Sequence, residues 1–170
     1  HKVCVETSPD GKVTPAMVEA VLARHDGTEH MVSPKMVYIS DTTEIGTVYT
    51  KAELTALRHC CDEHGLLLFL DGARLGSALT SPESDLTLAD LAALTDVFTI
   101  GGTKNGAMFG EAVVLTVPCP HFRWHIKQRG GMLAKGRLLG VQFQALLKDD
   151  RLYQKSYTKG QEIYQTGCYT

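Results

Sequence analysis

Three residues that could act together chemically follow two strand-like apolar runs of the sequence. Asp71 ends the run 66–70 (LLLFL), and Arg74 comes three residues later. Lys104 lies in the glycine-rich stretch 101–110, which follows a second apolar run. Glycine lets a backbone approach a ligand closely and adopts positive φ readily, so an amine among these glycines has room beside it for a planar group. A carboxylate, a guanidinium and an amine in this order indicate a small-molecule site.

A pyridoxal phosphate (PLP) site uses such a set of residues. A lysine forms a Schiff base with the cofactor, and a carboxylate facing the ring nitrogen keeps that nitrogen protonated. A buried carboxylate opposite a cation stays ionised, so Asp71 suits this role. Each motif also has a purely structural interpretation: Asp71 and Arg74 could form a local ion pair, and Lys104 could flank an Asn105-Gly106 hairpin turn. The order of the residues after successive strands favours the cofactor site.

The periodicity of apolar residues predicts the elements that position this set. The expected helices span about 15–24, 51–64, 88–94, 122–128 and 136–147, and the expected strands span 36–40, 66–71, 97–100 and 112–117. Residues 1–6 (HKVCVE) alternate like a further strand. Capping boxes at Thr50/Glu53 and Thr87/Asp90 mark the starts of two helices.

Helices and strands alternate along the chain, which predicts an α/β fold with a mostly parallel sheet and helices on both of its faces. Ligands of such sheets bind beyond the carboxyl ends of the strands. Asp71 ends one strand and Lys104 follows another. We therefore expect both side chains to reach the same edge of the sheet.

The composition of the chain is that of an ordinary globular domain. It has 170 residues, of which 44% are hydrophobic and 21% are charged, and its net charge is −2. This charge gives no broad attraction for nucleic acid or anionic membranes, so neither is an expected partner. No apolar run approaches the length of a membrane span, and the N-terminus lacks a signal-peptide pattern, so the expected location is the cytoplasm.

The cysteines and histidines give no metal motif. The five cysteines include no CxxC pair, and the adjacent Cys60 and Cys61 lie in a helical pattern, which suits neither zinc ligation nor a disulfide framework. His59 and His64 are five residues apart, which is a poor spacing for one helix face. We therefore expect reduced thiols that mostly pack in the interior, and no metal.

Three longer segments resemble a known family. Residues 36–79 (MVYISDTTEIG…DGARLGSAL), 86–114 (LTLADLAAL…GEAVV) and 126–147 (IKQRGGMLAKGRLLGVQFQALL) are similar to the threonine aldolase and β-eliminating lyase family of fold-type I PLP enzymes. The resemblance covers nearly all of residues 1–150. It implies an aspartate aminotransferase-like, PLP-binding large domain that is incomplete here. Residues 151–170 would then begin the connection toward a missing C-terminal small domain.

The resemblance also implies roles for individual residues. Lys104 aligns with the Schiff-base lysine, Asp71 with the aspartate that faces the pyridine nitrogen, and Arg74 with the arginine that contacts the ring oxygen of the cofactor. Thr103, next to Lys104, falls within the same cofactor-binding segment.

Two positions depart from the family pattern. Where many threonine aldolases have a histidine that assists the substrate hydroxyl, this sequence has Glu44, which becomes the candidate proton acceptor. Where many relatives have an arginine that reaches the cofactor phosphate, it has Leu133. Arg129 or Lys135 would have to take over the contact with the phosphate.

The activity implied by the resemblance is cleavage of L-threonine, or a related β-hydroxy amino acid, to glycine and an aldehyde. The same residues would also serve β-elimination or transamination. A different interpretation is that the chain is a non-catalytic fragment of a longer polypeptide. A non-enzymatic α/β binding module is a further alternative. Failure to form a covalent PLP adduct would favour the last two.

The segment 123–137 indicates an interface between subunits. It is rich in cations but is interrupted by Trp124 and other apolar residues, with two adjacent glycines near its centre. The alternative is a plain basic surface helix. By resemblance the segment lies near a subunit boundary, where Arg129 or Lys135 could add positive charge to a neighbour's cofactor phosphate. We expect a homo-oligomer, a dimer or a tetramer.

Overall fold

The computed structural model describes residues 3–6, 8–25 and 27–148. In these residues the helices are α1 (Pro15–Ala23), α2 (Lys51–His64), α3 (Leu75–Leu79), α4 (Leu88–Leu94), the 3₁₀ helix η1 (Thr103–Asn105), α5 (Phe122–Gln128) and α6 (Arg137–Leu147). The strands are β1 (Met36–Ser40), β2 (Leu67–Asp71), β3 (Val97–Gly101) and β4 (Glu111–Leu115). The predicted connection at 151–170 lies outside the described residues.

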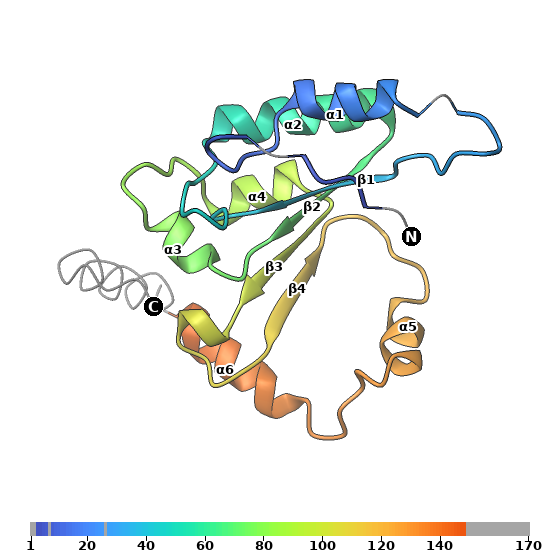
Figure 1. The fold of residues 1–170 in the computed structure, drawn as a ribbon. Coiled ribbons are helices and arrows are strands. Elements are labelled where there is room, and N and C mark those ends of the chain that lie inside the picture. The colour runs from blue at the N-terminus through green and yellow to red at the C-terminus, as the bar shows by residue number, and fades with distance from the viewer. Residues whose placement is uncertain (1–2, 7, 26, 149–170) are drawn as a thin grey trace.

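The strands form one sheet in the order β1-β2-β3-β4 (Figure 1). β1, β2 and β3 are parallel, and β4 runs antiparallel to β3. The parallel connections pass through helices, whereas β3 returns directly to β4 through the turn at 102–110. The predicted α/β fold with a mostly parallel sheet is therefore confirmed.

One face of the sheet packs against helices to form the core. Alternate residues of β1 and β2 are buried on this face, including Val37, Ile39, Leu68 and Leu70. Apolar residues of α2 and α4 belong to the same buried cluster, which explains the burial of this face. The opposite face carries the side chains of Met36, Tyr38, Leu67 and Val113, which are exposed in the described chain.

The predicted helix starts agree with local side-chain chemistry. Both capping boxes form, at Thr50/Glu53 for α2 and at Thr87/Asp90 for α4. α2 ends at Gly65, whose φ of 60° lies in the left-handed region that glycine tolerates. Local signals therefore define both helices closely.

Two expectations about local structure were wrong or incomplete. Residues 3–6 form no strand, because they pair with no neighbouring strand and leave Val3 and Val5 80% and 77% exposed. The short helices α3 and η1 were not predicted. Their N-caps make no side-chain hydrogen bond, so neither helix has the capping signal that marked α2 and α4.

Candidate active site

Asp71 is the last residue of β2, and both of its carboxylate oxygens have donors. The backbone N–H of Ala73 donates to Oδ1 at 2.9 Å, and the hydroxyl of Tyr38 donates to Oδ2. The carbonyl of Asp71 accepts a hydrogen bond from the N–H of Asp41 at 3.1 Å, which ties the end of β1 to the end of β2. The carboxylate is thus held in a fixed direction at the carboxyl edge of the sheet.

Tyr38 is a neighbour of Asp71 that the sequence analysis did not identify. It lies on β1, and its ring stacks on Phe69 with centroids 5.2 Å apart. Although the side chain is exposed, partial desolvation of the hydroxyl and then its hydrogen bond to Asp71 raise the pKa of Tyr38 to about 12, so the hydroxyl stays a neutral donor over the physiological range. The alternation of side chains along strands could have identified Tyr38. Tyr38 pairs with Phe69 on β2, and Phe69 lies on the same sheet face as Asp71, two residues further on.

Lys104 lies on η1, just beyond the end of β3, and is exposed. Within the described residues no hydrogen bond or ion pair involves its amine. The neighbouring Asn105 is buried, and its side-chain amide donates to the carbonyls of Gly101 at 2.6 Å and Ala73 at 3.4 Å. Asn105 therefore ties the turn that carries Lys104 to the loop that follows Asp71.

This contact corrects the hairpin interpretation of Asn105. The segment is a 3₁₀ turn rather than a two-residue hairpin turn, and Gly106 follows it with a φ of 100°. The positive φ explains the glycine at position 106. The side chain of Asn105 is buried and hydrogen-bonds to both loops, so it does not point to solvent.

The glycines beside the site keep backbones close together. A Cβ added to Gly72 would lie 1.9 Å from the carbonyl oxygen of Thr99, and one added to Gly101 would lie 2.5 Å from that of Ala73. The N–H of Gly101 donates to the carbonyl of Gly72 at 2.9 Å. The expected room for a planar group is therefore not created at Gly101, because neighbouring backbone fills that space.

Arg74 forms an ion pair with Glu44. The two guanidinium nitrogens lie 3.2 and 3.4 Å from the two carboxylate oxygens, and the Glu44 side chain is 77% exposed. The suggested ion pair between Arg74 and Asp71 does not occur in the described structure. The contact brings the loop after β1 beside the loop after β2, so Glu44 joins the same sheet edge.

Hydrogen bonds and one ion pair join the loops that carry Glu44, Arg74 and Lys104 at the carboxyl edge of the sheet. Thr103 is exposed next to Lys104, on the turn that Asn105 holds against the loop after β2. Arg129 caps the C-terminus of α5, and Figure 1 draws α5 apart from the carboxyl ends of β2 and β3. Within one chain, Arg129 is therefore not part of the cluster.

A buried carboxyl group lies directly behind this edge. Asp41 is 1% exposed, and its Oδ1 accepts a hydrogen bond from the N–H of Tyr49 at 3.3 Å. Its Oδ2 has no partner in the described structure. Burial raises the pKa of Asp41 to about 7. No sequence pattern had marked this residue as unusual.

A cavity of about 620 Å³ lies elsewhere, between the N-terminal segment, α1 and β1. Its lining is mostly apolar and includes Val5, Met17, Val21 and Tyr38. Asp71, Arg74 and Lys104 do not line it. We therefore assign the candidate site to the sheet edge and not to this cavity.

Comparisons with known proteins show the family to which the chain belongs. The family model for β-eliminating lyases matches residues 1–165. A solved structure of Leishmania major threonine aldolase superposes with a TM-score of 0.92 at 52% identity, over 98% of this chain and 50% of that chain. The fold is therefore the α/β fold of fold-type I enzymes. The chain belongs to the threonine aldolase and β-eliminating lyase family.

Curated relatives agree with this assignment. The low specificity L-threonine aldolase of Pseudomonas sp. (strain NCIMB 10558) is 38% identical over 154 residues, which cover 87% of this chain and 43% of the relative. The low specificity L-threonine aldolase of Pseudomonas aeruginosa is 33% identical over 151 residues, covering 88% and 43%. The chain thus spans less than half the length of these two relatives.

No helix among the described residues is long and apolar enough to cross a membrane. The four described cysteines, Cys4, Cys60, Cys61 and Cys119, are free.

Proposed function

We propose that the protein is a PLP-dependent carbon–carbon lyase that cleaves L-threonine, or a related β-hydroxy amino acid, to glycine and an aldehyde. The observation that supports the proposal is that Asp71 and Lys104 lie on two segments at the carboxyl edge of the sheet that Asn105 joins by hydrogen bonds to Ala73 and Gly101. Similarity to proteins named low specificity L-threonine aldolases supports the choice of substrate.

The donor set at this edge fits PLP. Lys104 offers an exposed amine that is not engaged by the described residues, and it would hold the cofactor covalently. Asp71 would face the ring nitrogen, and Arg74 and Thr103 would contact other polar atoms of the cofactor. When bound, PLP supplies an electron sink for the bond that breaks at the substrate Cα.

The protein's own residues would maintain the protonation state that this chemistry needs. The carboxylate of Asp71 would hold a proton at the ring nitrogen, and its direction is fixed by the Ala73 N–H and the Tyr38 hydroxyl. Because Tyr38 stays protonated, it donates to Asp71 at any working pH. Tyr38 is therefore a positioning residue in this proposal.

Glu44 is the proposed proton acceptor for the substrate hydroxyl, directly or through a water molecule. Its carboxylate is exposed beside Arg74, so a substrate that enters the edge can reach it. A carboxylate oxygen at this position can accept a proton from the substrate hydroxyl. The same guanidinium orients Glu44 toward the site.

Two other functions would give different experimental results: another PLP-dependent reaction, and no catalytic function at all. β-Elimination and transamination would use the same Asp71 and Lys104, and product analysis separates them from aldol cleavage. A chain without catalytic function would fail to bind PLP covalently. The names of the curated relatives favour the aldolase over both alternatives.

The test is absorbance spectroscopy of the chain mixed with PLP. We expect a visible band that borohydride abolishes, with the reduced adduct on Lys104 in a peptide map. Lys104→Ala should remove the band while leaving the fold intact, because the side chain is exposed and the substitution removes no core volume. Lys127→Ala, on the exposed surface of α5, is the matched control and should keep the band. A band that survives in Lys104→Ala would refute the site.

The proposal extends to assembly and location. We propose a cytoplasmic homo-oligomer that uses a small amino acid as substrate and binds no nucleic acid. Exposed apolar residues in the segment 123–137 support an interface there, since Trp124 is 74% exposed and Leu133 is 59% exposed. Arg129 or Lys135 would then reach the cofactor phosphate of a neighbouring subunit.

A further inference from the structure

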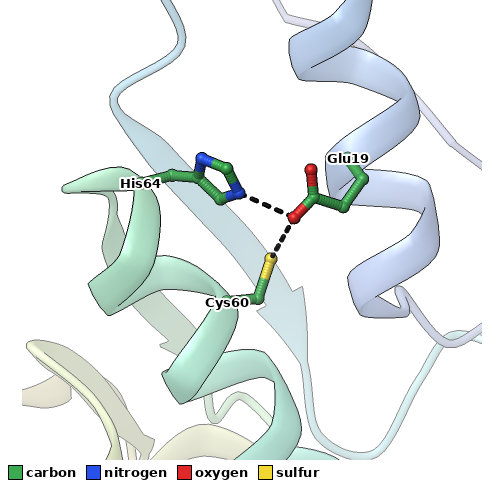
Figure 2. A group of neighbouring side chains, drawn as sticks. All are labelled: Glu19, Cys60 and His64. Atoms are coloured by element: carbon green, nitrogen blue, oxygen red, sulfur yellow. Dashed lines mark hydrogen bonds and ion pairs between the residues drawn. The ribbon is translucent and has the colours of Figure 1, made fainter.

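Three metal-ligating side chains meet between α1 and α2, away from the candidate active site. They are Glu19 on α1 and Cys60 and His64 on α2 (Figure 2). We infer that they form a second site, which binds a divalent cation with affinity for sulfur and nitrogen, and that Zn²⁺ is the ion it suits best. This inference does not depend on the proposed PLP chemistry.

Helix geometry explains how the ligands come together. Cys60 and His64 are four residues apart on α2, so their side chains lie on the same face one turn apart. α1 packs beside α2, and Glu19 follows Val18, which is buried in the core. Figure 2 shows all three side chains pointing into the space between the two helices.

The distances are close to those of a tetrahedral zinc site. The Nε2 atom of His64 lies 2.6 Å and the Sγ atom of Cys60 lies 3.9 Å from Oε1 of Glu19. All three ligand atoms are within 4.8 Å of one another. Zn–N and Zn–O bonds of about 2.0–2.1 Å and a Zn–S bond of about 2.3 Å would place tetrahedral ligand atoms about 3.3–3.6 Å apart.

Small side-chain movements would therefore admit an ion. The separation of His64 and Glu19 must widen, and that of Cys60 and Glu19 must shorten, each by less than about 1 Å. The ligand atoms of Cys60 and His64, which lie within 4.8 Å of each other, must approach by at most about 1.3 Å. The side chains of His64 and Glu19 are 34% and 52% exposed, so they are free enough to adjust. A water molecule from solvent would complete the coordination.

The charges of the ligands also match a divalent ion. A Glu19 carboxylate and a Cys60 thiolate together balance the two positive charges, and His64 binds as a neutral imidazole. Burial and the nearby carboxylates of Glu19 and Glu63 raise the pKa of the Cys60 thiol, so without metal it is protonated. The ion would take the place of that proton, which leaves to solvent.

The position of the cluster points to a structural role. His64 ends α2 shortly before β2 begins, whereas Asp71 lies at the other end of β2. The ion would thus sit at the opposite edge of the sheet from Lys104. Among the residues of α1, which are all described, only Val18 is fully buried, so an ion shared with α2 would fasten this helix to the domain.

Local patterns in the sequence give no sign of this cluster, so no metal was expected. The cysteines form no CxxC pair and His59 and His64 are poorly spaced, whereas the cluster combines Cys60 with His64. Its third ligand, Glu19, lies far away in the sequence. Only the packing of α1 against α2 brings the set together.

The test is a titration of the reduced, chelator-treated chain with Co²⁺, without added PLP. We expect a thiolate-to-cobalt charge-transfer band in the near ultraviolet that saturates at a single ion per chain and disappears when Zn²⁺ displaces the cobalt. Zn²⁺ should also raise the midpoint of thermal unfolding, because it binds the folded chain preferentially. Absence of the band in the wild-type chain would overturn the inference.

Variants assign the band to this cluster. Cys60→Ser should abolish it, and His64→Gln and Glu19→Gln, which change exposed side chains, should weaken cobalt binding and remove the thermal shift. Cys4→Ser is the matched control, because the Sγ atom of Cys4 lies 4.0 Å from Nε2 of His25 and forms a second cysteine–histidine pair. A band that persists in Cys60→Ser, or that is lost in Cys4→Ser, would contradict the assignment.

Discussion

Asp71 has a donor on each carboxylate oxygen, yet its proposed task requires a full negative charge. The N–H of Ala73 and the hydroxyl of Tyr38 orient the group. An amide at this position could still hydrogen-bond a ring nitrogen, but it could not hold the proton there. Replacing Asp71 with asparagine therefore removes the charge while keeping the size and shape of the side chain.

We expect Asp71→Asn to lower the rate of threonine cleavage far more than it lowers PLP occupancy. A loss of one charge-assisted contact at a reacting centre typically costs about 100-fold or more in rate. The measurement is kcat together with the dissociation constant of PLP in the full-length enzyme. Activity within a few-fold of the wild type would show that Asp71 does not hold the proton.

Asp41 gives a prediction about stability. Its folded-state pKa of about 7 lies above its ordinary value of 3.8, because burial disfavours the charged form. Between these values the folded chain binds more protons than the unfolded chain, so the free energy of unfolding falls as pH rises through this window, by an amount on the order of 4 kcal/mol. Below the window this penalty is absent.

Asp41→Asn should remove that penalty, since the amide is neutral at every pH. We expect the variant to be more stable than the wild type at pH 8, with a smaller advantage at pH 5. Urea denaturation at the two pH values measures this difference. Glu83→Gln, which neutralises an exposed carboxylate, is the control and should leave the pH dependence unchanged. If Asp41→Asn changed the free energy of unfolding equally at both pH values, the proposed cost of ionising the buried Asp41 would be wrong.

At the scale of elements, the site depends on how closely the ends of β2 and β3 approach. Gly101 faces the backbone of Ala73, and the backbone cannot move aside as a flexible side chain can. Asn105 then fastens η1 to the same loop through the Ala73 carbonyl. Lys104 is therefore positioned by backbone packing, since its side chain has no hydrogen bond or ion pair with the described residues.

Gly101→Ala should destabilise the chain by about 1–3 kcal/mol, because its Cβ would lie 2.5 Å from the carbonyl oxygen of Ala73. Gly140→Ala is the matched control, since a Cβ there meets nothing within 4 Å and lies in α6, where alanine favours the helix by up to about 1 kcal/mol. Chemical denaturation of both variants provides the comparison. A neutral Gly101→Ala would mean that the two loops are free to separate.

At the scale of the whole molecule, exposed apolar residues mark surfaces that the described chain does not cover. Trp124 is the largest of them and contacts only the ring of His121 among the aromatic residues described, at 5.2 Å between centroids. Tryptophan residues that bury their side chains between subunits contribute strongly to binding. The segment 123–137 is thus the proposed place of subunit contact.

We expect the full-length protein to be at least a dimer, and Trp124→Asp to raise the dissociation constant of the assembly at least about tenfold, a change of about 1.4 kcal/mol. Light scattering over a range of protein concentrations measures it. Val32→Asp changes a similarly exposed apolar residue before β1 and should leave assembly unaltered. A catalytically active wild-type monomer at working concentration would rule out the proposal.

The sequence by itself determined most of the helices and strands and predicted the sheet edge at which the proposed site lies. The capping boxes at Thr50 and Thr87 and the apolar run before Asp71 are local signals, because hydrogen bonds within a few residues and side-chain periodicity generate them. Parallel strands place their carboxyl ends together, so Asp71 and Lys104 were expected at one edge before any contact was known.

Only the tertiary structure decided which side chains touch. Tyr38 with Asp71, Glu44 with Arg74, and Glu19 with His64 join residues that are 33, 30 and 45 positions apart. Such contacts depend on strand register and on how one helix packs against the next. Burial in the common core fixes these arrangements, and no local spacing in the sequence encodes them.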